Sequence, residues 1–155
     1  RQKWLLGSSR EEFIMTRPVV NRERGRVVQG SSERKGVLGY ITWTVAAEAG
    51  NAITVSGQAN DEAGNAMAEA CAFSWYWAND SAGLTPTATA HDGGTAAGTD
   101  GAIIEQVADL SGIAVTEADG DIDFVATDAG AFTTYLVAVN PDGTLSVSGA
   151  VTHAA

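Results

Sequence analysis

The side chains with the clearest chemical potential are three aspartates at alternate positions, Asp119, Asp121 and Asp123. Clustered carboxylate oxygens are the ligands that Ca²⁺ prefers, and this spacing matches the start of an EF-hand loop. The sixth position of such a loop is Phe124 here rather than Gly, and the twelfth is Gly130 rather than Glu. We therefore interpret Asp121 and Asp123 as the solvated face of a strand, and we expect neither a metal site nor a cofactor.

A serine, a histidine and an aspartate that could form a hydrolytic triad are also present, at Ser81, His91 and Asp92. However, His91 opens a His-Asp-Gly-Gly segment typical of a turn, and His153 lies two residues from the C-terminal end, where we expect fraying. The sequence has no Gly-x-Ser-x-Gly elbow and no glycine-rich phosphate loop. We therefore predict no catalytic residues and no enzymatic activity.

The single cysteine, Cys71, excludes an intrachain disulfide. It falls within an apolar run that we predict to be a strand. Such a setting does not favour the thiolate, because no basic side chain is nearby to lower the thiol pKa. We expect Cys71 to be buried and inert.

Three consecutive aromatic residues, Trp75, Tyr76 and Trp77, suggest a stacking platform for a sugar. Alternation along a strand instead places both tryptophans on one face with Phe73, and only Tyr76 on the other. We therefore interpret the aromatic residues as core. The predicted core aromatic residues are Phe73, Trp75, Trp77, Phe124 and Phe132.

Short alternating runs and turns predict the elements that position these side chains. From about Ile41 onward, such runs are separated by turn sequences such as Pro141-Asp142-Gly143, a common hairpin closure. The stretch from Asn79 to Gly101 is long for a loop, so we expect it to contain one short strand. About seven to eight short strands at this spacing predict an all-β fold, an immunoglobulin-like β-sandwich, over residues 41–155.

The distribution of charge divides the chain. All nine Lys and Arg lie within residues 1–35 beside four Glu, a net charge of +5, whereas residues 36–155 contain fifteen acids and no Lys or Arg, a net charge of −15. We assign residues 1–40 to a basic extended N-terminal arm. An acidic surface repels phosphates, so we expect no nucleic-acid partner for the sandwich.

Apolar residues interleaved with the basic ones suggest that the arm binds a partner, although a solvated flexible tail is the alternative. The candidate partner-binding residues are Trp4, Leu5, Leu6, Arg10, Phe13, Ile14, Arg17, Arg22, Arg24 and Arg26. The sequence has no run of about 20 apolar residues, so we expect no membrane partner. The chain begins at Arg1 rather than Met, and we expect a processed product or part of a longer one.

A string of short motifs over roughly residues 50–153 resembles the C-terminal immunoglobulin-like domain of tailed-bacteriophage virion structural proteins. Asp128-Ala129-Gly130-Ala131-Phe132 resembles the Asp-x-Gly-x-Tyr corner of immunoglobulin-like domains, with Phe in place of Tyr, so we expect burial alone to stabilise this bend. The other motifs are Asn79-Asp80-Ser81-Ala82-Gly83, His91-Asp92-Gly93-Gly94, Ala97-Gly98-Thr99-Asp100-Gly101, Glu117-Ala118-Asp119-Gly120-Asp121-Ile122-Asp123 and Tyr135-Leu136-Val137-Ala138-Val139-Asn140-Pro141-Asp142-Gly143.

The resemblance implies a non-catalytic virion component, a head-decoration, head-fibre or tail-associated protein. Its implied partners are other virion proteins, namely capsid or tail subunits, and copies of itself; residues 1–40 match nothing in that family. Two alternatives remain: a carbohydrate- or cell-binding adhesion module, and an extracellular filament subunit assembled by arm or strand exchange. The implied location is the virion, or an extracellular surface for the alternatives.

Overall fold

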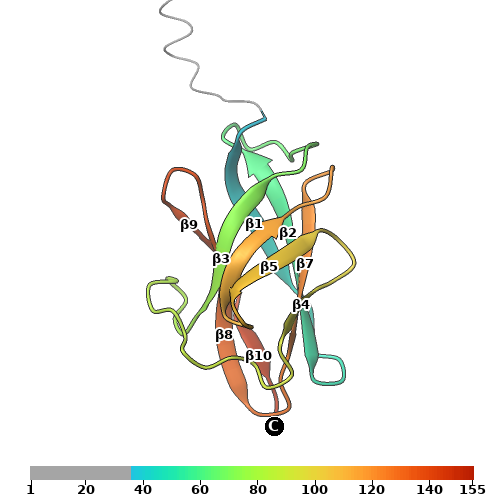
Figure 1. Ribbon diagram of the computed structural model, residues 1–155, viewed down its shortest axis with the longest axis vertical. Coiled ribbons are helices and arrows are strands. Elements are labelled where there is room, and N and C mark those ends of the chain that lie inside the picture. Colours follow the sequence, from blue (N-terminus) through green and yellow to red (C-terminus); the bar gives the residue numbers. More distant parts are fainter. Residues whose placement is uncertain (1–35) are drawn as a thin grey trace, which may run out of the picture. The chain divides into compact units, whose positions relative to one another are not determined.

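The computed structural model describes residues 36–155, and these residues form an all-β sandwich (Figure 1). The predicted fold class is confirmed, although the described residues form ten strands rather than seven to eight. The strands are β1 (Leu38–Val45), β2 (Ala52–Asp61), β3 (Ala72–Ala78), β4 (Thr95–Ala97), β5 (Ala102–Val107), β6 (Ser111–Val115), β7 (Asp121–Thr127), β8 (Phe132–Val139), β9 (Leu145–Val147) and β10 (Val151–His153).

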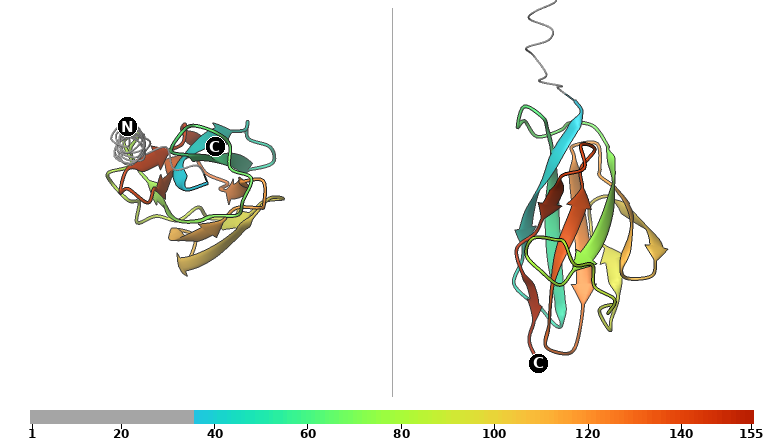
Figure 2. Two further views of the ribbon diagram at one scale, coloured as in Figure 1. Left: turned by 90° about the horizontal axis from the view of Figure 1, so that it is seen from above. Right: turned by 90° about the vertical axis from the view of Figure 1, so that its left-hand side faces the viewer.

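The strands form two antiparallel sheets that face each other (Figure 2). The four-stranded sheet has the order β1-β2-β7-β4, and the six-stranded sheet has the order β10-β8-β3-β6-β5, with β9 beside β8. These orders correspond to strands ABED and GFC of an immunoglobulin domain. The β5–β6 hairpin extends the second sheet by two further strands.

The space between the sheets is filled by apolar side chains at alternate strand positions. Trp75, Trp77 and Phe124 are at most 1% exposed, and Trp75 packs edge-on against Phe124 with ring centroids 5.2 Å apart. Phe73 is also buried. Of the predicted core aromatic residues, Phe132 alone is half-buried, because it begins β8 at the end of the sandwich, where it packs against His91.

Hydrogen bonds to Ser146 connect β1 of one sheet to β9 of the other. Ser146 Oγ accepts a hydrogen bond from Ile41 N at 3.0 Å, and Ser146 O accepts one from Trp43 Nε1 at 2.9 Å. Strand β1 begins at Leu38, whose side chain is buried and which pairs with Asp61. The last three residues assigned to the arm, 38–40, therefore belong to the sandwich.

Several strand bounds differ from the sequence prediction for local reasons. The expected strand within Asn79–Gly101 is β4. The segment after the Pro141-Asp142-Gly143 turn forms two short strands, β9 and β10, because Ser148 Oγ accepts a hydrogen bond from Leu136 N at 2.9 Å where the chain leaves β8. Cys71 precedes β3 rather than lying within it; it is half-buried, and burial raises the pKa of its thiol.

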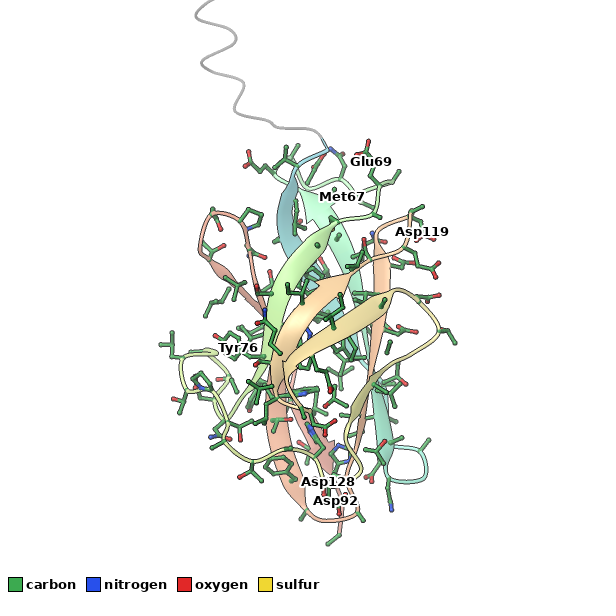
Figure 3. The ribbon with its side chains drawn as sticks, viewed as in Figure 1. Met67, Glu69, Tyr76, Asp92, Asp119 and Asp128 are labelled. Atoms are coloured by element: carbon green, nitrogen blue, oxygen red, sulfur yellow. The ribbon has the colours of Figure 1, made fainter. Side chains whose placement is uncertain are left out.

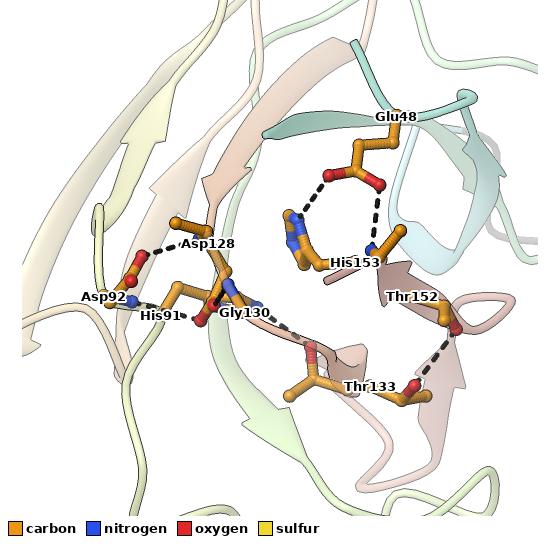
Figure 4. Close-up of polar contacts among 11 residues, drawn as sticks. Glu48, His91, Asp92, Asp128, Gly130, Thr133, Thr152 and His153 are labelled. Carbon is orange, nitrogen blue, oxygen red and sulfur yellow. Dashed lines mark hydrogen bonds and ion pairs between the residues drawn. The ribbon is translucent and has the colours of Figure 1, made fainter. Parts of the chain in front are cut away.

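The bend before β8 is stabilised by hydrogen bonds and not by burial alone, contrary to expectation. Asp128 accepts hydrogen bonds from Gly130 N at 2.9 Å and Asp92 N at 3.1 Å. Asp92 in turn accepts one from Ala129 N at 2.9 Å. This reciprocal pair of aspartates stabilises the bend at the place where a tyrosine corner uses a tyrosine hydroxyl (Figure 4).

Candidate functional site

The predicted partner-binding residues of the arm, Trp4 to Arg26, lie outside the described residues. The candidate site described below therefore lies on the sandwich, residues 36–155. Among these residues no helix has the length and apolar character needed to cross a membrane.

The residues considered for a triad do not form one. His91 Nε2 is hydrogen-bonded to Thr134 Oγ1 at 3.1 Å, and Asp92 Oδ1 accepts from a backbone amide instead of from histidine. Ser81 is exposed on a separate loop. The hydrogen bonds of the described residues thus connect none of the three to another.

The two histidines nevertheless meet inside the sandwich, which sequence reasoning missed. His153 is 1% exposed because β10 pairs with β8, so the expected fraying at this residue is wrong. Its ring centroid lies 5.5 Å from that of His91, and its Nδ1 lies 3.8 Å from Glu48 Oε1 (Figure 4). Within the described residues, no three His, Cys, Asp or Glu side chains converge as metal ligands would.

The outer surface of the four-stranded sheet, which we call the acidic face, is polar. A shallow groove of about 300 Å³ there is lined by Thr42, Thr44, Ser56, Gly57, Gln58, Asp100, Asp121, Ile122 and Asp123. Burial, followed by repulsion from Asp119 and Asp100, raises the pKa of Asp121. Neighbouring carboxylates therefore oppose the ionisation of Asp121.

One of these aspartates is not on a solvated face, contrary to expectation. Asp123 is 9% exposed, because the segment after β4 covers it. Thr99 Oγ1 donates a hydrogen bond to its carboxylate at 2.9 Å, and Gly98 N donates one to its carbonyl at 2.9 Å. These contacts give Asp123 a structural role, because they attach the segment after β4 to β7.

The outer surface of the six-stranded sheet, which we call the uncharged face, has a different character. Alternation opposite to buried Phe73 and Trp75 places uncharged side chains at every outward position. Outward positions are occupied by Ala72, Ser74, Tyr76, Ala102, Ile104, Gln106, Val107, Ser111, Ile113, Val115, Thr133, Tyr135, Val137, Val139, Leu145, Val147 and Thr152. Glu105, the one acidic residue in the strands of this sheet, alternates to the other side.

The strand register aligns four apolar side chains and one serine in a row across this face. Ile104 lies opposite Ile113, Ile113 opposite Ser74, Ser74 opposite Val139, and Val139 opposite Leu145. Ile104 is exposed, and Ile113, Val139 and Leu145 are half-buried. Contiguous apolar surface that stays accessible to solvent marks interaction sites in folded proteins. The row is therefore the strongest candidate binding feature of the described residues.

A groove of about 390 Å³ lies on the same face. It runs between the β5–β6 hairpin and the loop after β3, and its lining includes Tyr76, Pro86, Val107 and Leu110. Large apolar side chains near it are exposed: Ile104 by 60%, Val107 by 51% and Leu84 by 75%. The groove and the row together offer apolar contact without a carboxylate.

The proposed sugar platform does not exist at Trp75, Tyr76 and Trp77. Both indoles point into the core. Tyr76 does point outward from β3, but its hydroxyl donates a 2.6 Å hydrogen bond to Gly83 O, so the 79–86 loop lies against it (Figure 3). No pair of adjacent exposed rings remains there for stacking.

No protein-family model matches this chain, and no curated protein matches it.

Proposed function

We propose that this chain is a structural component of a tailed-phage particle, a capsid-decoration, head-fibre or tail-associated module that its N-terminal arm anchors. The observation that supports this most is the separation of positive and negative charge along the chain. All nine Lys and Arg residues precede the sandwich, and residues 36–155 contain fifteen Asp and Glu residues but no Lys or Arg. The basic N-terminal segment is suited to an acidic partner, whereas the acidic sandwich is repelled by the same partner.

The sandwich itself fits a displayed module. Its acidic face and its uncharged face lie on opposite sheets. On a crowded particle surface, an uncharged face permits contact with neighbouring subunits, while carboxylates keep the other face hydrated. The order of short motifs that resembles the phage immunoglobulin-like domain agrees with this role.

A filament subunit is the second candidate, because strand β5 ends its sheet without a second partner among the described residues. Strand addition to such an edge generates open polymers when donor and acceptor surfaces differ. Polymerisation of the purified chain would favour this candidate over a particle component. The adhesion module loses its main support, since the tryptophans are buried.

The test is to purify virus particles from the producing culture on a density gradient and inventory their proteins by mass spectrometry. We expect peptides of this chain at a fixed ratio to the major capsid or tail protein. Absence from purified particles would overturn the proposal.

Arm variants then test the anchor on the same particles. Substitution of Trp4 and Phe13 by Ser should abolish occupancy at any salt concentration, because apolar contacts are insensitive to screening. Substitution of Arg22 and Arg24 by Ser should lower occupancy mainly at low salt. Thr44→Ser on the acidic face is the matched control and should leave occupancy unchanged; normal occupancy by both arm variants would contradict arm anchoring.

A further inference from the structure

Strand β5 is the terminal strand of the six-stranded sheet. Strand β6 pairs with one of its edges, and no strand in residues 36–155 pairs with the other. Five of its six residues are exposed. An edge strand with unpaired backbone N–H and C=O groups is a template for a further strand.

The side chains of this strand match a partner that carries no charge at the contact. Ile104 and Val107 are more than half exposed, and the row from Ile104 to Leu145 continues the apolar surface inward over the sheet. Glu105 is turned to the opposite side, where its Oε1 accepts a hydrogen bond from Asp109 N at 3.2 Å. A basic segment finds no carboxylate on the outer side of this edge.

A second copy of the chain meets these requirements. Two sandwiches with fifteen acids and no basic residue each repel one another over their acidic surfaces. The β5 edge and the uncharged face are where that repulsion is least. Antiparallel strands can be related by a two-fold axis, so β5 is able to pair with itself.

The register of such a pair follows from charge. An axis at Glu105 would place two glutamates directly opposite each other, which is destabilising. An axis at Ile104 places Ile104 opposite itself and Glu105 opposite Ile103 of the second copy. The overlap covers the regular part of the strand, Ala102 to Glu105, and reaches Gln106, where the pairing with β6 is irregular. It also keeps the uncharged faces of both copies on the same side.

We propose that two copies of this chain pair through β5, antiparallel about a two-fold axis at Ile104, so that their six-stranded sheets become one continuous sheet. The row from Leu145 to Ile104 of one copy then continues directly into Ile104 of the other. This pairing deepens the proposed function, since it gives a particle module a defined neighbour, but it is a property of the purified chain. Its failure would leave the anchoring of the arm to particles untouched.

The experiment is sedimentation velocity of the full chain over a concentration series at low and high sodium chloride. We expect a dimer whose dissociation constant falls as salt rises, because screening weakens the repulsion between two acidic sandwiches. Docking of the basic arm on another copy would show the opposite salt dependence and would overturn the proposal. A monomer at all concentrations, or polymers without limit, would also overturn it.

Two matched variants locate the contact. Ile104→Glu places like charges opposite each other at the axis and should weaken the dimer at least about tenfold. Thr44→Glu adds the same charge on the acidic face, at another exposed strand position, and should change the dissociation constant much less. Equal effects of the two variants would show that only net charge matters and would contradict the β5 contact.

Cross-linking provides a readout that does not depend on weakening the dimer. Opposed residues of an antiparallel pair have Cβ atoms roughly 4.5–5.5 Å apart. Ile104→Cys should therefore give a covalent dimer with a short bis-maleimide, whereas Thr44→Cys and the unmodified chain, with Cys71 alone, should not. Failure of Ile104→Cys to cross-link, with its melting temperature retained, would exclude the proposed axis.

Discussion

Trp75 and Tyr76 are neighbours in sequence, but their side chains point to opposite faces of β3 and make different contacts. The Trp75 side chain is 1% exposed and packs on Phe124 in the core. Trp75→Ala should therefore lower the free energy of unfolding by about 3–5 kcal/mol, as truncations of large buried aromatic residues do. Urea denaturation followed by circular dichroism measures this change.

Tyr76→Phe is the matched control for that substitution. It removes only the hydroxyl that donates to Gly83 O. The expected loss is about 1 kcal/mol, the usual net contribution of one hydrogen bond. Similar small losses of unfolding free energy for both variants would mean that the Trp75 side chain contributes little to core packing.

The buried histidines predict how stability depends on pH. Burial, followed by repulsion from His153, lowers the pKa of His91 from 6.5 to about 4. Between these pH values the unfolded chain binds more protons at this position than the folded chain. The free energy of unfolding should therefore decrease as the pH is lowered from 6.5 toward 4, and be unaffected by His91 above that window.

Thermal melts across this pH range test the assignment, with His91→Phe as the comparison. Phenylalanine keeps a ring beside Trp77 and Phe132 but cannot take up a proton. Its melting temperature should depend less on pH over the window than that of the unmodified chain. An identical pH dependence in both proteins would show that His91 does not titrate there.

At the scale of the element, local alternation was sufficient to predict most strands. Strand β8 is recognisable because turn residues flank it on both sides and because Tyr135 to Val139 form a continuous apolar run, which is typical of a strand buried on both faces. Pairing between strands is not local. That β5 ends a sheet, and that β6 inserts beside β3, depends on contacts between segments far apart in sequence.

The candidate site was missed for the same physical reason. Sequence pattern can suggest the outward residues of a single strand, but only the register shows that Ile104, Ile113 and Val139 fall in one row. His91 and His153 likewise come from a loop and a short terminal strand that no local pattern connects. The sequence-level signal was the scarcity of charge in these strands, which carry one acid among them.

At the scale of the whole molecule, the absence of basic residues from the sandwich limits what can stabilise it. No Lys or Arg is present in residues 36–155 to form ion pairs with its acids. Core packing and backbone pairing between strands must therefore supply the stability. Added salt should not weaken such a fold, since it screens mutual repulsion between carboxylates.

The same division of the chain predicts where it can be cut. A chain that begins at Gly36 keeps all ten strands and should melt at the same temperature as the full chain. A chain that begins at Gly39 loses Leu38, whose side chain is 6% exposed and belongs to the core. Burial of one leucine contributes about 1.5–3 kcal/mol, so the shorter chain should be measurably less stable.

Differential scanning calorimetry of the three chains separates the possible roles of the arm. Equal melting temperatures for the full chain and the Gly36 chain, with a lower value for the Gly39 chain, would place the domain boundary just before β1. A Gly36 chain that fails to fold would mean that the arm supplies part of the core, and would contradict an arm that serves only for attachment. Restoring Val37 and Leu38 to the Gly39 chain should recover stability, because Leu38 returns to its place on the inner face of β1 opposite Asp61.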